Sequence, residues 1–115
     1  MERLITKQQQ VAMLKNGLKT RKGHSGNHRP VVKLFTPDAG CTWLLSELDP
    51  EEPDLAFGLC DLGLGFPELG YVSLSELAQV RGALGLPVER DLHFKPTKSL
   101  MKYAEDAHQA GRITA

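Results

Sequence analysis

The chain has 115 residues, of which 41% are hydrophobic and 24% charged, and its formal net charge is zero. This length allows one hydrophobic core, and the composition is that of an ordinary globular protein, which argues against disorder over most of the chain. The apolar runs are far shorter than the ~20 residues that a transmembrane helix needs. The first ten residues lack the apolar core of a secretion signal, so we expect a cytoplasmic protein without a membrane partner.

The two cysteines, Cys41 and Cys60, form no Cys-x-x-Cys pair. A reduced cytoplasmic setting, with both thiols as small and inert core residues, is the simplest interpretation.

The zero net charge hides a segregation along the chain. Residues 1–33 contain eight basic residues and one acidic residue, residues 34–91 contain two basic and eleven acidic residues, and residues 92–115 contain four basic and two acidic residues. Two explanations stay open. The basic and acidic parts attract each other within one domain, or the basic part serves a nucleic-acid or acidic protein partner.

Residues 4–19 predict an amphipathic helix. Thr6 and Gln9 have the spacing of a capping box, and apolar residues recur with the helical period. The expected apolar side consists of Leu4, Val11, Leu14 and Leu18. Residues 20–30 contain two glycines and almost no apolar side chain, which predicts a flexible loop.

The sequence therefore predicts two regions in the chain. We expect residues 1–29 to form a basic N-terminal helix and a flexible loop, and residues 30–115 to form an α+β domain. The helix either docks on the domain by its apolar side or moves freely.

The rest of the chain predicts a sheet with two helices. Strands are expected at residues 31–35, 41–48, 55–62, 71–73 and 88–94, and helices at residues 74–82 and 97–110. The first four strands follow each other too closely for helical crossovers, so the pairing should be antiparallel. The predicted fold class is therefore α+β: a small antiparallel sheet of four or five strands packed with two helices, plus the N-terminal amphipathic helix.

Five segments carry a family resemblance. They are 30–37, 42–45, 57–63, 67–77 and 89–94. Through them the chain resembles an uncharacterised bacterial family, domain of unknown function 2958, which is found on plasmids and integrative elements. The resemblance covers roughly residues 30–110 and leaves the basic arm outside. It implies a role in DNA transfer, regulation or counter-defence, and it supplies no active-site residues.

The basic arm is the candidate nucleic-acid-binding region. Its proposed phosphate contacts are Lys15, Lys19, Arg21, Lys22 and Arg29. Such contacts give salt-sensitive binding that does not depend on base sequence. None of the seven aromatic residues is interleaved with this group, so the sequence predicts no base-stacking platform.

A second candidate is a set of carboxylates and one histidine. Glu89, Asp91 and His93 alternate along the strand expected at 88–94, and Asp61 joins them if its strand is adjacent. Such a cluster could hold a divalent metal or act as acid and base. The alternative is a polar strand face turned to water. Arg90, on the apolar side, should reach either a carboxylate partner, such as Glu68 or Asp61, or the edge of the strand.

A third candidate is the loop at 63–70, where Phe66 and Glu68 suit contact with a protein partner. It lacks the glycine and lysine pattern of a phosphate-binding loop, so a plain turn is the alternative.

These observations favour a non-enzymatic accessory protein of a mobile genetic element, without a cofactor. It would bind nucleic acid, or a protein that acts on nucleic acid, for regulation, transfer or counter-defence. The alternative is a metal-assisted hydrolase that uses the carboxylate and histidine cluster. The oligomeric state stays open.

Overall fold

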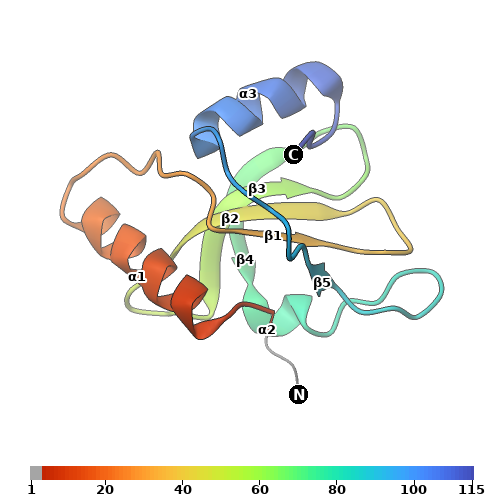
Figure 1. Ribbon diagram of the computed structural model, residues 1–115, viewed down its shortest axis with the longest axis horizontal. Coiled ribbons are helices and arrows are strands. Elements are labelled where there is room, and N and C mark those ends of the chain that lie inside the picture. The colour runs from red at the N-terminus through yellow and green to blue at the C-terminus, as the bar shows by residue number, and fades with distance from the viewer. Residues whose placement is uncertain (1–3) are drawn as a thin grey trace.

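The computed structural model describes residues 4–115. In chain order its elements are α1 (Lys7–Arg21), β1 (Val32–Phe35), β2 (Thr42–Leu48), β3 (Leu55–Asp61), β4 (Glu68–Ser73), α2 (Leu74–Leu77), β5 (Glu89–Arg90) and α3 (Leu100–Ala110). The strands form one antiparallel sheet in the order β4-β3-β2-β1-β5 (Figure 1). The predicted α+β class, with its five-stranded antiparallel sheet, is therefore confirmed.

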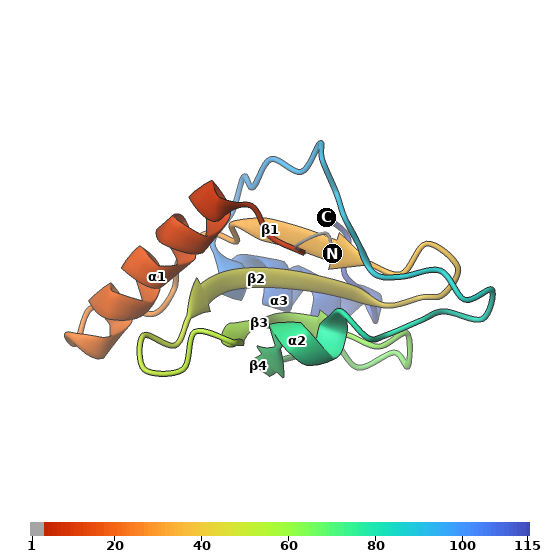
Figure 2. The ribbon, with the colours of Figure 1, turned by 90° about the horizontal axis from the view of Figure 1, so that it is seen from below.

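The sheet is covered on both faces (Figures 1 and 2). On one face α3 buries Leu100, Tyr103 and Ala104 against Leu44 and Leu59. On the other face the N-terminal segment, α2 and the chain before β5 cover a larger cluster. That cluster includes Ile5, Met13, Val32, Leu34, Trp43, Leu45, Leu77 and Val88. Because successive side chains of β2 and β3 point to opposite faces of the sheet, these strands contribute to a hydrophobic cluster on each face.

The helix α1 lies at the end of the sheet, beside the turn between β2 and β3 (Figure 2). The predicted capping box is present, because Thr6 Oγ1 accepts from Gln9 N and Gln9 Oε1 accepts from Thr6 N. The predicted docking side is right for Leu4 and Leu14, which pack against the core, and wrong for the other two residues. Val11 and Leu18 are exposed, 60% and 46% respectively. The helix docks instead through Met13 and Gly17.

The reason for this docking is the close approach of two backbones. A Cβ atom at Gly17 would overlap the carbonyl of Leu48 at the end of β2. Next to it, the Asn16 side-chain amide donates to the Ser46 carbonyl (2.9 Å). The absence of a side chain at Gly17 lets α1 approach the backbone of β2 closely, and the Asn16 amide binds it there.

The strand β2 contains a bulge at Ser46. The pairing of β2 with β3 is regular from Thr42 to Leu45, then shifts, so that Glu47 pairs with Phe57. The extra residue changes the alternation of side chains beyond it. Because of the bulge, Glu47 lies on the face covered by α3.

Several boundaries differ from those predicted, and among them α1 begins at Lys7 instead of residue 4 and α3 begins at Leu100 instead of residue 97. The strand expected at 88–94 is only Glu89–Arg90, because the Asp91 side chain accepts from His93 N (2.8 Å) and turns the chain away from β1. The helix expected at 74–82 ends at Leu77, where Val80 N donates to the Leu77 carbonyl in a tighter turn. The strand expected at 71–73 begins earlier, at Glu68.

The segment between α1 and β1 is irregular and is tied to α3. The His28 carbonyl accepts from Leu100 N (2.8 Å), and Asn27 Oδ1 accepts from Met101 N (3.0 Å). These contacts satisfy backbone groups at the start of α3. Within residues 4–115, no helix is long and apolar enough to cross a membrane.

Candidate functional site

Three lysines form one outward-facing row on α1. Lys15, Lys19 and Lys22, here called the basic face, follow each other at helical spacing and are exposed. They point away from the side that carries Met13 and Gly17. Among the residues that the structure describes, none of the ion pairs involves these lysines. The basic face is therefore a rigidly held positive surface without internal neutralisation.

The other two predicted phosphate contacts, Arg21 and Arg29, lie in different surroundings from these lysines. Arg21 forms an exposed ion pair with Glu51 in the turn between β2 and β3 (2.7 Å). Such a pair adds little stability and is easily exchanged. Arg29 is exposed in the segment that leads to β1. The structure thus gathers Lys15, Lys19 and Lys22 on one surface and holds Arg21 against the acidic turn.

The four candidate metal ligands are not brought together. Asp61 ends β3, whereas Glu89 lies in β5, and β1 and β2 separate these strands. Three strand spacings amount to about 14 Å. Among residues 4–115 no group of three or more His, Cys, Asp or Glu side chains could hold a metal ion.

Each of the two aspartates in that set has a local structural partner. Asp61 accepts from Gly63 N (2.8 Å) and from Ile113 N (2.9 Å), so it ties the chain end to β3. Asp91 accepts from His93 N and lies 3.5 Å from Lys33 Nζ. The His93 hydrogen bond, assisted by Lys33, lowers the pKa of Asp91.

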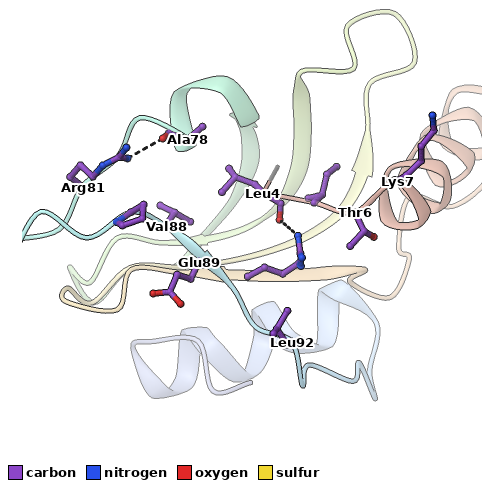
Figure 3. Close-up of a pocket in the computed structure, with 11 residues that line it drawn as sticks. Leu4, Thr6, Lys7, Ala78, Arg81, Val88, Glu89 and Leu92 are labelled. Carbon is purple, nitrogen blue, oxygen red and sulfur yellow. Dashed lines mark hydrogen bonds between the residues drawn. The ribbon is translucent and has the colours of Figure 1, made fainter. Parts of the chain in front are cut away.

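Arg90 lies in β5 at the edge of the sheet, in agreement with one of the two predicted alternatives. Its Nη1 donates to the Leu4 carbonyl (3.0 Å), at the edge of the sheet opposite β4. Asp61 and Glu68, the carboxylates expected beside it, belong to β3 and β4. Figure 3 shows this contact in a cleft of about 820 Å³ between Leu4–Lys7 and Val88–Leu92, with the Glu89 carboxylate turned away from it.

The loop after β3 exposes its apolar residues. Leu62, Leu64 and Phe66 are exposed to 56%, 73% and 79%. Glu68, which follows them at the start of β4, is exposed as well. Three large apolar side chains at alternate positions of one loop are a feature of contact surfaces.

A group that the sequence did not predict lies beside α1. Glu47, Phe57 and Tyr71 pair directly across β2, β3 and β4, so they share one face of the sheet. We call them the Glu47 row. Phe57 and Tyr71 contact each other edge to face, with ring centroids 5.1 Å apart. Tyr71 remains 59% exposed. The bulge at Ser46 is what brings the carboxylate into line with the two rings.

The Glu47 carboxylate is buried, with 6% of its residue surface exposed. Its Oε1 accepts from the Thr20 hydroxyl (3.3 Å), which also lies 2.9 Å from His28 Nε2. Within the described part of the chain, no hydrogen bond or ion pair reaches Oε2. Burial raises the pKa of Glu47, against the opposing effects of Thr20 and His28. A buried carboxylate with a perturbed pKa in a cavity is a mark of functional sites.

The cysteines are not part of this group. Burial, together with the Glu68 charge, raises the pKa of Cys60 to about 11. Its thiol is protonated at neutral pH and is a poor nucleophile. This agrees with the inert role expected from its sequence context.

The residues of the Glu47 row, which the sequence did not predict, come together only through contacts between distant parts of the chain. Glu47 is one of eleven acidic residues between 34 and 91, and the two rings come from strands far from the basic arm in sequence. A bulge cannot be recognised from alternation alone, because Leu44, Leu45 and Leu48 surround it with apolar residues on both faces.

The fold and these surfaces define an α+β protein in which one antiparallel sheet lies between helices and a basic helix is docked at its end. The chain belongs to a family described as Protein of unknown function (DUF2958), whose model matches residues 4–114. The match begins before α1, so the expectation that the basic arm lies outside the resemblance is wrong. Comparisons with curated proteins and with solved structures gave no significant match.

Proposed function

We propose that this protein is a non-enzymatic accessory protein of a mobile genetic element and that it binds nucleic acid in the cytoplasm. The binding surface is the basic face of α1, and Arg29, in the segment that leads to β1, is a further candidate contact. The observation that carries the proposal is the row formed by Lys15, Lys19 and Lys22, which is exposed and forms no ion pair with the described residues, on a helix docked by its opposite side. The family resemblance to proteins of plasmids and integrative elements supports the setting.

The dimensions of the basic face suit a phosphate backbone. From Lys15 to Lys22 the helix advances about 10 Å. One strand of DNA carries about three phosphates over that length. Docking through Gly17 and Asn16 keeps the lysines in place, so less order has to be gained on binding.

Equilibrium binding to fluorescent 20-nucleotide probes, single-stranded and duplex, tests the proposal at low salt. The triple variant Lys15→Gln, Lys19→Gln, Lys22→Gln should lose about tenfold or more in affinity, because three phosphate contacts are removed. Glutamine keeps the helix propensity of lysine, so folding is preserved.

A matched control has the same change in net charge at exposed residues elsewhere. The variant Lys95→Gln, Lys102→Gln, Arg112→Gln should bind within about twofold of the unmodified protein, since its changes lie outside the basic face. Absence of binding by the unmodified protein, or an equal loss in both triple variants, contradicts the proposal.

The second candidate is contact with a protein that handles nucleic acid. It is favoured by the exposure of Leu62, Leu64 and Phe66, followed by Glu68. A partner bound here should be lost in Phe66→Ala and in Glu68→Lys and kept in Leu84→Ala, which changes an 80% exposed leucine on another loop. Retention by both loop variants counts against this surface.

Metal-assisted hydrolysis, the enzymatic alternative, has no support from the proposed cluster. Asp61 is separated from Glu89, and both oxygens of Asp61 accept backbone hydrogen bonds.

A further inference from the structure

The Glu47 row forms the floor of a cavity of about 390 Å³. Thr20 at the end of α1, the segment 25–27 and the first turn of α3 form its walls. Cavities of this size hold small ligands or single groups of larger ones. We call it the Glu47 pocket.

The pocket offers one polar contact among apolar ones. Glu47 Oε2 has no partner in the described structure, while Oε1 is held by Thr20. Phe57, Tyr71, Leu100 and Met101 supply apolar and aromatic surface. A flat group that stacks on a ring and donates a proton at its edge matches these features.

We propose that the Glu47 pocket binds one unstacked base of a single-stranded nucleic acid, with guanine preferred. The base stacks on Tyr71 and donates N–H groups to the Glu47 carboxylate. The inference rests on the proposed function, because the strand that carries this base is the one whose backbone the basic face contacts.

The surrounding charges favour a base over a cationic side chain. Glu47 lies beside His28, and the loop that borders the pocket begins at Lys22 and ends at Arg29. Lys22 and Arg29, at the two ends of this loop, disfavour an approaching lysine or arginine and attract a polyanion. A neutral base carried on a phosphate chain brings a polyanion to these residues and presents uncharged donors to Glu47.

The carboxylate selects among the bases. Guanine presents two adjacent donors, N1–H and the N2 amino group, to a pair of carboxylate oxygens. Cytosine and adenine place an acceptor beside their amino group, and thymine and uracil place carbonyls on both sides of N3–H. An acceptor or carbonyl facing a carboxylate is unfavourable. Guanine therefore forms the best pair with Glu47 Oε1 and Oε2.

The experiment compares two oligonucleotides at pH 8, a thymidine 11-mer and the same strand with guanine at its centre. The guanine probe should bind about tenfold more tightly, in the range expected of a well-formed contact to a base edge. Replacing guanine with inosine, which lacks the amino group, should remove most of this preference.

Variants assign the preference to the pocket. Glu47→Gln and Tyr71→Ala should each abolish the guanine preference, so that the two strands bind equally to either variant. Glu76→Gln and Leu84→Ala, with exposed side chains outside the pocket, should keep the preference. Guanosine alone, followed by the NMR signal of the Met101 methyl group, should shift that signal in the unmodified protein and not in Tyr71→Ala.

The outcomes separate this inference from the proposed function. Equal binding of both strands, lost in the triple lysine variant, overturns the guanine pocket and leaves the basic face supported. A Met101 shift with guanosine, without binding of either strand, supports the pocket as a base site and overturns the basic face. No shift with guanosine and no guanine preference, or a shift produced instead by an arginine peptide, overturns the pocket assignment.

Discussion

Glu47 and Asp61 are the acidic residues that are buried in the described structure, and they differ in their hydrogen bonds. Asp61, the other buried acid, accepts two backbone hydrogen bonds, whereas Glu47 accepts one from a hydroxyl. A buried charge with incomplete hydrogen bonding destabilises a fold. This distinction separates a residue that holds the chain together from one that is available to a ligand.

The cost of burying this charge predicts a pH effect on stability. Glu47→Gln should raise the free energy of unfolding at pH 7, and the gain should shrink toward pH 4. Burial raises the folded-state pKa of Glu47 above the ordinary glutamate value of 4.5, while Thr20 and His28, the groups that face it, act in the opposite direction. The folded state therefore binds more protons than the unfolded state in the window above 4.5.

The direction of the pH effect follows from this difference in bound protons between the folded and unfolded states. The stability contributed by the protonated carboxyl is fully present below the unfolded-state pKa and is lost as the pH rises through the folded-state pKa. Urea unfolding at several pH values from 4 to 8 measures the effect. Glu52→Gln makes the same chemical change at an exposed position and should show no such trend. A gain from Glu47→Gln that is largest at pH 4 would refute the assignment.

At the scale of elements, α1 is part of the fold and also positions the Glu47 carboxylate in its pocket. Its Asn16 amide binds the Ser46 carbonyl in the bulge, and the bulge directs Glu47 toward Phe57. Its Thr20 hydroxyl then holds Glu47 Oε1. One helix therefore presents lysines on its outer side and positions the acidic pocket from its inner side.

Gly17→Ala tests this docking. Helix propensity alone favours alanine over glycine by about 1 kcal/mol. Because the new Cβ would overlap the Leu48 carbonyl, we expect a net loss of about 1–3 kcal/mol in the free energy of unfolding. Gln8→Ala, at an exposed position of the same helix, should change stability little. A Gly17→Ala protein that is as stable as the unmodified one would show that α1 does not pack closely on β2.

The sheet, α3 and the capping boxes were predictable because their signals are local. Thr6 with Gln9, and Gly111 at the end of α3, mark helix ends through neighbouring residues only. The Glu47 row was not predictable, because it depends on a bulge and on three paired strands. The short β5 was missed for a similar reason: its alternation suits a strand, but Asp91 caps a turn in the following residues.

At the scale of the whole molecule, the segregated charges stay largely separate in space. Among the described residues, Arg21 with Glu51 and Lys33 with Asp91 are the ion pairs that join the first 33 residues to the acidic part. The basic face keeps its charge, and the acidic turn between β2 and β3 lies on its inner side (Figure 2). This arrangement favours the interpretation in which the basic arm serves an external polyanion.

The salt dependence of nucleic-acid binding tests this central claim most directly. Affinity for a duplex probe should be measured between 50 and 300 mM monovalent salt for the unmodified protein and for the triple Lys15, Lys19 and Lys22 variant. The slope of log K against log salt should become shallower by about 2.7 in the variant, at about 0.9 for each phosphate contact removed. An unchanged slope would contradict the account, because the lysines of the basic face would then release no counterions on binding.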